Sequence, residues 1–187
     1  MVKVRQKFFE NILLEELLSS EGFLGSSSLE NLKDKKGFFL GLRKGFSVFD
    51  LEKSLTTYFN AINLVKAFNE SSLQILFIGC PSYLEKTLEE EFINSRHLFV
   101  RGDSWVLGSL TNFSQSNLSP SLIVTFNESG VFQSKECFKE EIPLISFVDD
   151  TSNLNFVDYP ILVNLKSKGA SLMYHNLIKQ AISKPDV

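Results

Sequence analysis

Residues 73–79, Leu-Gln-Ile-Leu-Phe-Ile-Gly, are the stretch that most constrains the fold of this 187-residue chain. The run is mostly apolar, is too short for an ordinary helix, and is followed by Cys80 and Pro81, which interrupt regular structure. This pattern predicts a strand that is buried on both faces. Such strands occur mostly in parallel sheets that are covered by helices.

Strand-like and helix-like segments alternate around this run from residue 46 to the end of the chain. The other candidate strands are 97–100, 121–126, 144–148 and 159–163, and the candidate helices are 51–68, 83–94, 131–141 and 167–183. Asp50 is a candidate N-cap for the first of these helices, and Ser82 for the second. On the last helix, Leu172, Leu177, Ile178 and Ala181 are expected to point inward. Alternation of this kind is typical of an α/β domain.

Upstream of this region, the chain predicts a helix and a hairpin. Residues 8–18 have helical apolar spacing, and residues 37–41 and 46–50 predict a hairpin at the edge of the sheet with a basic turn. We therefore expect a doubly wound, flavodoxin-like or Rossmann-like α/β fold. It has a mostly parallel sheet with helices on both faces, an N-terminal helix and an edge hairpin. Residues 1–36 are predicted to form a helical and basic extension, and residues 37–187 a single α/β domain.

Composition excludes several classes of protein. The net charge of −3 argues against a protein that coats nucleic acid through bulk charge, although a local basic patch stays open. Two cysteines make neither a disulfide framework nor a metal site. No apolar run approaches the roughly 20 residues of a membrane span. The first residues resemble neither a signal peptide nor a transit peptide.

An enzymatic or small-molecule site would form at the carboxyl ends of the strands, near Gly79, Arg101 and Asp149. Cys80 lacks an activating partner, so a buried thiol is the favoured interpretation over a nucleophile. Asp149 and Asp150 suit a magnesium ion, but a solvated loop or a helix cap is favoured. Gly79 belongs to no GxGxxG or phosphate-binding loop, so a dinucleotide site has no support. These residues make no convincing catalytic set, and no cofactor is predicted.

Two basic groups suggest contact with RNA. The first lies within residues 96–113, where Arg101, Trp105 and Asn112 mix cationic, aromatic and amide groups that suit phosphates and unpaired bases. An equal interpretation is a loop folded over the sheet edge with Trp105 as its anchor. The second group comprises Lys33, Lys35, Lys36, Arg43 and Lys44. The alternative interpretation of this group is an ordinary solvated face.

Six segments, in order, resemble motifs of one family. Residues 105–113 resemble W-L-G-G-x-L-T-N-[WF], and residues 39–54 resemble F-G-x-R-N-x-x-H-I-I-N-L-x-K-T. Residues 75–79 occupy the place where the family has I-L-F-V-G-T, and residues 142–151 resemble G-I-P-V-x-x-x-V-D-T-N. Residues 157–161 resemble V-D-[YF]-x-I-P-x-N, and residues 22–26 stand at a G-x-x-F-G-H-x segment. The family is the bacterial and organellar type of small-subunit ribosomal protein S-two.

The departures from this pattern indicate a reduced, divergent member. The family's long helical hairpin looks deleted, because Asn112 and Pro120 are only eight positions apart. Ser104 stands where the family has an Arg before the Trp, and Arg101 is a candidate substitute. The reduced length and the 18 Phe residues favour an organellar ribosome, mitochondrial rather than plastid. Without a transit peptide, the gene is expected to lie in the organelle.

The resemblance implies a structural, non-catalytic protein between the head and body of the small ribosomal subunit. Its implied partners are small-subunit rRNA and neighbouring ribosomal proteins, with no membrane and no small-molecule substrate. The residues expected to contact rRNA are Arg101, Trp105 and Asn112, then Arg43 and Lys44, with Lys33, Lys35 and Lys36 after them. An α/β enzyme or small-molecule-binding domain remains the alternative, because fold alone does not exclude it.

Overall fold

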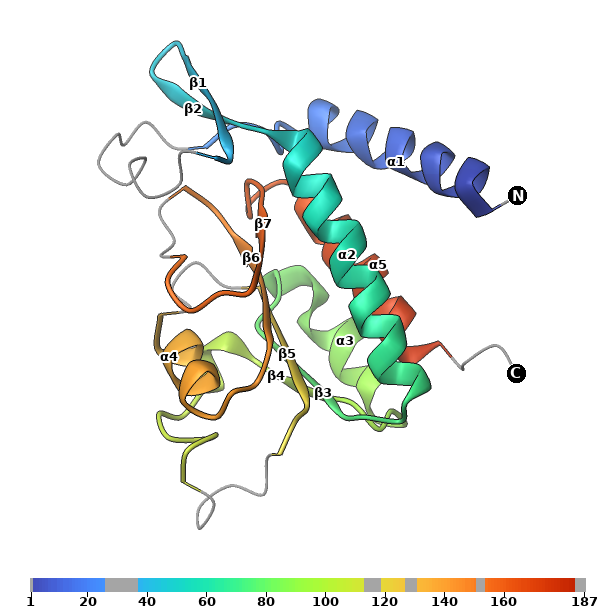
Figure 1. The fold of residues 1–187 in the computed structure, drawn as a ribbon, viewed down its shortest axis with the longest axis vertical. Helices are drawn as coiled ribbons and strands as arrows, with labels where there is room; N and C mark the ends of the chain where they lie inside the picture. The colour runs from blue at the N-terminus through green and yellow to red at the C-terminus, as the bar shows by residue number, and fades with distance from the viewer. Residues whose placement is uncertain (1, 26–36, 113–118, 127–130, 151–153, 184–187) are drawn as a thin grey trace.

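The structure, a computed structural model, describes residues 2–25, 37–112, 119–126, 131–150 and 154–183 (Figure 1). None of the helices in these residues is both long and apolar enough to cross a lipid bilayer. In chain order, the elements are α1 (Val2–Ser19), β1 (Phe39–Arg43), β2 (Phe46–Phe49), α2 (Leu51–Glu70), β3 (Ile75–Ile78), the 3-10 helix η2 (Ser82–Leu84), α3 (Glu85–Phe92), β4 (Leu98–Val100), the 3-10 helix η3 (Gly102–Ser104), β5 (Leu122–Phe126), α4 (Val131–Lys139), β6 (Leu144–Val148), β7 (Tyr159–Leu162) and α5 (Lys168–Ile182).

Five parallel strands form the main sheet in the order β4-β3-β5-β6-β7. Counted from the first strand of the sheet, this is the 2-1-3-4-5 order of flavodoxin-like folds. Every residue of β3, β5 and β6 is buried, as the apolar runs predict. The predicted α/β class, the parallel sheet and the burial of the 73–79 run are therefore confirmed. This run forms the inner strand β3, but β5 is the central strand of the sheet.

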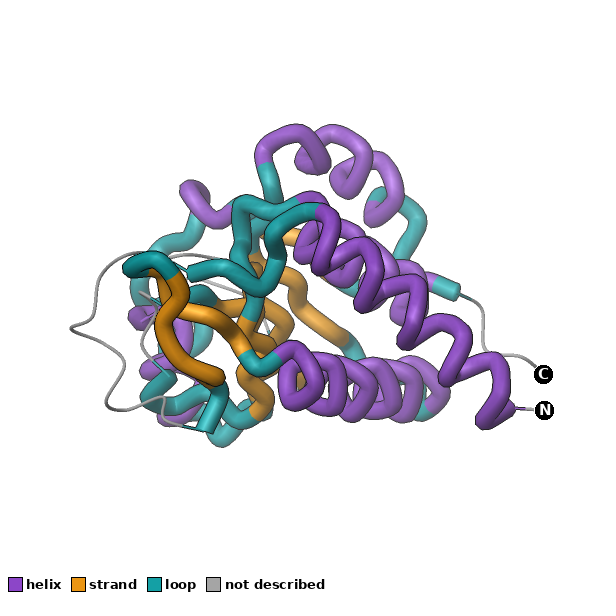
Figure 2. The backbone as a smooth tube through the Cα atoms, turned by 90° about the horizontal axis from the view of Figure 1, so that it is seen from above, coloured by secondary structure: helices purple, strands orange, loops and turns teal. Residues whose placement is uncertain are grey.

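The two faces of the sheet are covered differently. Ile75 and Phe77 point into the larger core, which is closed by α1, α2, α3 and α5. Figure 2 shows the long helices lying together on one side of the strands. Leu76 and Ile78 point to the other face, where Cys137 of α4 and Leu110 of the β4–β5 connection complete a smaller core. Helices thus lie on both faces, but an irregular segment shares the cover of the second.

The hairpin of β1 and β2 forms a separate two-stranded sheet, so its predicted place in the edge of the main sheet is wrong. Outside the hairpin itself, β2 forms an isolated antiparallel bridge between its residue Val48 and Leu24 of the N-terminal segment. Apolar contacts hold it above the carboxyl ends of β6 and β7, because Phe49 packs with Val148 and Leu162. The hairpin therefore projects from the body at one end of the molecule (Figure 1).

Two of the predicted helix features need correction and one is confirmed. Asp50 caps α2 as expected, because its side chain accepts the backbone N–H of Lys53 at 3.3 Å. Ser82 does not cap α3, because it begins a 3-10 turn that precedes the helix. Leu172 was expected to point inward but is 38% exposed, beside an opening that none of the neighbouring helices fills.

Candidate nucleic-acid interface

The tip of the hairpin presents Arg43 and Lys44 to solvent. Arg43 pairs with Phe46 across a two-residue turn, and Lys44 and Gly45 have positive φ values of 51° and 85°. Two positive φ values are what a type I′ turn requires, and this turn matches the twist of the flanking strands. The sequence pattern thus places two cations at the end of a projecting ribbon.

Apolar side chains accompany these cations. Leu40 is 71% exposed, and Leu42 and Phe46 are also largely exposed. At the base, Ser47 donates a hydrogen bond to the Asp150 carboxylate at 2.9 Å, and both residues are buried. The base of the hairpin is therefore fixed to the body, while its tip is available for contact.

The other predicted contact lies within residues 96–113, and its residues 105–112 form a chain of turns on the second face of the sheet. Leu110 is buried, and the Trp105 ring packs partly buried against the same small core. Among the described residues, the buried Trp105 indole nitrogen has no hydrogen-bond partner. This packing matches the interpretation of Trp105 as an anchor, although Val106 and Leu107 are exposed.

A buried carboxylate fixes this segment. Glu136 of α4 accepts the backbone N–H of Gly108 at 2.8 Å and that of Leu110 at 3.3 Å. Carboxylates that accept backbone N–H groups make strong hydrogen bonds, so one side chain defines the path of the turns. Glu136 was not among the predicted site residues, because a single glutamate in a helical segment does not indicate which backbone groups it will bind.

Arg101 lies directly after β4, but its charge is shared. Its guanidinium is 3.3 Å from the carboxylate oxygens of both Glu85 and Asp103. Asn112 is exposed at the far end of the segment, where its backbone N–H donates to the Gly108 carbonyl at 2.8 Å. Arg101 therefore has to exchange a carboxylate for a phosphate in order to contact RNA.

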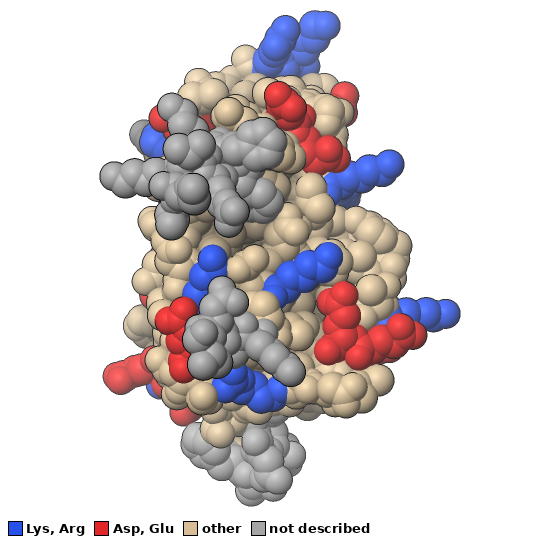
Figure 3. Space-filling model, turned by 90° about the vertical axis from the view of Figure 1, so that its right-hand side faces the viewer, with Lys and Arg blue, Asp and Glu red and all other residues tan. Residues whose placement is uncertain are grey.

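The structure does not bring the predicted contacts together. The hairpin lies at one end of the molecule, and the segment that ends at Asn112 leads to the opposite end (Figure 1). Lys33, Lys35 and Lys36 lie outside the described residues. Lys and Arg side chains project at the top of Figure 3, the hairpin end, whereas basic and acidic side chains are interspersed below.

The alternative site at the strand ends is occupied by the chain's own side chains. The Tyr174 hydroxyl donates to the Gly79 carbonyl at 2.8 Å, and Asp150 is engaged by Ser47. Burial, with the charges of Glu85 and Glu89, raises the pKa of the Cys80 thiol to about 12, which disfavours the thiolate that a nucleophile needs.

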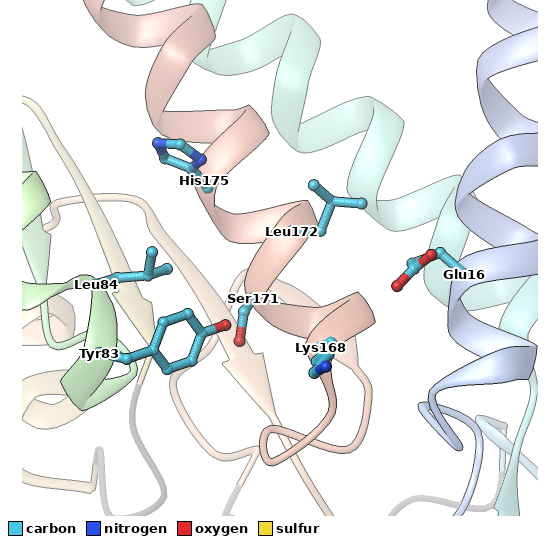
Figure 4. Close-up of a pocket in the computed structure, with 7 residues that line it drawn as sticks. All are labelled: Glu16, Tyr83, Leu84, Lys168, Ser171, Leu172 and His175. Atoms are coloured by element: carbon cyan, nitrogen blue, oxygen red, sulfur yellow. The ribbon is translucent and has the colours of Figure 1, made fainter.

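Within the described residues, neither a metal cluster nor the cavity in Figure 4 supports that alternative. Among the described residues, no group of three or more His, Cys, Asp or Glu side chains is placed to hold a metal ion. The cavity in Figure 4 is lined by Glu16, Tyr83, Leu84, Lys168, Ser171, Leu172 and His175, so it is not formed by Gly79, Arg101 or Asp149.

Comparison with known families decides between these interpretations. The sequence profile of the family described as ribosomal protein S2 matches residues 17–129 and, as a second segment, residues 114–185. The chain belongs to the ribosomal protein S2 family. The predicted family is confirmed, and membership of a family of ribosomal proteins supports a structural component rather than an enzyme.

The S2 relatives are bacterial proteins named small ribosomal subunit protein uS2. The one from Endomicrobium trichonymphae is 23% identical over 220 positions, which cover 92% of this chain and 90% of the relative. The one from Geotalea uraniireducens is 30% identical over 104 residues, 56% of this chain and 40% of that protein. The one from Helicobacter acinonychis is 34% identical over 84 residues, 45% of this chain and 33% of that protein. The latter two matches thus span well under half of each relative.

The alignments also bear on the predicted deletion. The 220 positions aligned with the Endomicrobium protein exceed the 187 residues of this chain, so that relative has residues that this S2 family member lacks. The family profile matches in two segments that meet around residues 114–129, next to the predicted deletion between Asn112 and Pro120. Both observations agree with a shortened β4–β5 connection.

Proposed function

We propose that this chain is a structural component of the small ribosomal subunit, where it joins small-subunit rRNA to neighbouring ribosomal proteins between the head and the body. The observation that carries the proposal is the S2 family match, which extends over residues 17–185 in two segments. Relatives that share this family are named small ribosomal subunit proteins. The chain needs no cofactor and no small-molecule substrate for this role.

The hairpin tip supplies the first rRNA contact in this proposal. Arg43 and Lys44 are exposed on a projecting turn, whereas the whole chain has a net charge of −3 and the body shows basic and acidic side chains interspersed (Figure 3). Local cations on a projection reach phosphates without bringing the acidic body close to them. The screening length of about 8 Å at physiological salt limits repulsion from the rest of the chain.

The β4–β5 connection supplies a second, more specific contact. Asn112 and the edge of Trp105 offer amide and aromatic groups to unpaired bases, and Arg101 offers a planar cation. The carboxylates of Glu85 and Asp103 weaken the pull of Arg101 on phosphate, which favours Arg43 and Lys44 as the main electrostatic contacts. Lys33, Lys35 and Lys36 complete the proposed set.

We also propose that the ribosome is mitochondrial. Support comes from the 18 Phe residues and from a chain shorter than its alignment with a bacterial relative. Subcellular fractionation tests the location, with mitochondrial and plastid ribosomes as the compared fractions. Recovery only in plastid or cytosolic ribosomes would contradict this part of the proposal without affecting the small-subunit role.

Sedimentation tests the main proposal. Ribosomal subunits are separated on a sucrose gradient at high salt, and an antibody follows this chain across the fractions. We expect the chain to migrate with the small subunit, because a structural component stays bound when loosely held factors dissociate. A free soluble pool with no subunit-bound fraction would overturn the proposal.

A matched pair of variants then tests the hairpin contact in the same gradient. The pair Arg43→Gln and Lys44→Gln removes two exposed cations from the tip, and Lys66→Gln with Lys86→Gln removes two exposed cations from helices. We expect only the hairpin variant to dissociate at lower salt. Equal salt sensitivity of the two variants would remove the tip from the proposed interface.

A further inference from the structure

Two exposed aromatic rings pack against each other beside the end of α4. Phe138 is 64% exposed and Phe156 is 42% exposed, and their ring centroids are 4.8 Å apart. Phe138 comes from α4 and Phe156 from the segment that leads into β7. Single exposed apolar residues are ordinary, but a pair contributed by two elements next to a cavity indicates a binding surface.

The cavity beside this pair has a volume of about 310 Å³. Its walls are apolar and aromatic with two carboxylates, and the lining residues are Cys137, Phe138, Glu141, Ile142, Pro143, Asp158 and Tyr159. No Lys, Arg or His belongs to this set, although α4 carries exposed Lys135 and Lys139 nearby. A basic side chain matches this composition, because its carbon stem packs on rings while its head group reaches carboxylates.

Glu141 of the cavity wall and the neighbouring Phe156 both have positive φ values. Phe156 has a φ of 66° and Glu141 a φ of 55°, in the left-handed region that bulky residues seldom adopt. A turn closed by the Val157 N–H and the Leu154 carbonyl, at 3.2 Å, accommodates Phe156. Glu141 lies just past the end of α4, where the Ile142 N–H donates to the Cys137 carbonyl at 3.0 Å, and these two turns fix the positions of Glu141 and Phe156 on the surface.

We propose that the acidic–aromatic surface, formed by Phe138, Glu141, Phe156 and Asp158, docks a basic segment of a neighbouring ribosomal protein. An Arg or Lys of that segment enters the cavity with its stem against Phe138 and its charge toward Glu141 and Asp158. The inference rests on the proposed membership of the small subunit, and it adds a partner surface that none of the predicted rRNA contacts includes. The carboxylates favour a protein partner over RNA, because they repel phosphate.

Photo-crosslinking in assembled subunits tests this surface. Phe138→p-benzoylphenylalanine keeps an aromatic ring at the centre of the surface, and subunits that contain this variant are purified by sedimentation before irradiation. We expect an adduct with a protein segment that has an Arg or Lys close to the crosslinked residue. We expect Glu141→Lys to lower the adduct yield about tenfold, because it places a cation where the partner's cation binds.

Glu90→Lys is the matched control, because Glu90 is an exposed carboxylate on α3, outside the surface. It should leave the yield unchanged. Glu141→Gln, which removes the charge and keeps the shape, provides a second variant if Glu141→Lys perturbs folding, and it should also lower the yield.

The outcomes separate this inference from the proposed function. An adduct with rRNA, no adduct in assembled subunits, or a protein adduct unaffected by both Glu141 variants would overturn the docking surface while the small-subunit role stands. Failure of the unsubstituted chain to sediment with the subunit would overturn the proposed function and this inference with it.

Discussion

The hairpin tip and the β4–β5 connection both resemble segments of the S2 family, but they are built in opposite ways. The hairpin forms its own two-stranded sheet and leaves Arg43, Lys44 and neighbouring apolar side chains exposed. The connection lies on the main sheet, buries Leu110 and is fixed by the Glu136 carboxylate. The hairpin tip contributes little to the core and presents positive charge, whereas the β4–β5 connection is part of the core and presents a surface whose shape is fixed by packing.

This difference shows that resemblance to a family motif does not reveal why its residues are needed. Trp105 and Leu110 have a reason within the chain, because they cover Leu76 and Ile78 of β3. Arg43 is exposed and has no comparable packing role, so under the proposed function its contribution comes from binding rRNA. Substitutions should therefore lower stability in one region and binding in the other.

The largest expected effect is the loss of stability from Leu110→Ala. Removal of a buried leucine side chain leaves a cavity in the smaller core, which costs about 3 kcal/mol of unfolding free energy. Chemical denaturation monitored by circular dichroism measures the loss. The exposed Leu107→Ala in the same segment is the control, and an equal loss from both variants would contradict the anchored connection.

Glu136→Gln should have the next largest effect on stability. The amide keeps one acceptor for the Gly108 or Leu110 N–H but presents a second donor to the other, so we expect a loss of about 2 kcal/mol. Hydrogen exchange should show faster exchange at these two N–H groups than at the amides of β5. If their protection is unchanged, Glu136 does not fix the connection.

Removal of the hairpin cations should affect binding and leave stability alone. For Arg43→Gln with Lys44→Gln, we expect affinity for full-length small-subunit rRNA to fall on the order of tenfold. The slope of log affinity against log salt should decrease by about 2, one for each lost phosphate contact. Filter binding at several salt concentrations measures both quantities. A loss of unfolding free energy above about 0.5 kcal/mol would contradict the expectation that these substitutions leave stability unchanged.

The smallest expected effect is a pH dependence that belongs to the sheet and not to the hairpin. His97 is buried, where its Nδ1 accepts the Ile75 N–H at 3.2 Å and its Nε2 lies 3.1 Å from the Ala181 carbonyl. Burial lowers the pKa of His97 below its usual 6.5, partly offset by the Ala181 carbonyl.

The unfolded chain therefore binds more protons in this range, and the stability contributed by neutral His97 is lost as pH falls below about 6.5. Denaturation between pH 5 and pH 7.5 should show the decline, and His97→Gln should flatten it. Because the proposed hairpin contact does not include His97, rRNA binding by the folded chain should not follow the same curve.

The sequence was sufficient for the parts of the fold that depend on local patterns. The apolar runs at 75–78, 122–126 and 144–148 became the central strands, and Asp50 capped α2 as its position predicts. The strands and the N-cap could be predicted from short-range information, since each depends on the types of consecutive residues.

Features that depend on distant partners could not be predicted. The hairpin was assigned to the sheet edge because its alternating pattern does not say which strand lies beside it. Glu136 and Leu172 were missed for the same reason, because a helix period gives a face but not the backbone or gap that this face meets. For the candidate interface, residue type suggested two basic groups but could not say how they lie relative to each other, and the fold places the hairpin tip and the end of the β4–β5 connection far apart (Figure 1).

The contact between Ser47 and Asp150 has a consequence for the order of folding. These residues are 103 positions apart, and the Ser47 carbonyl also receives the Gly25 N–H at 2.8 Å. The tight turn at Lys44 and Gly45 can close as soon as it is synthesised. The part of the body on which the hairpin packs does not exist until β6 has been synthesised. Docking of the hairpin is therefore a late, long-range step, since loop closure over such a distance is slow. Arg43 and Lys44 reach their final orientation only after most of the chain has been translated.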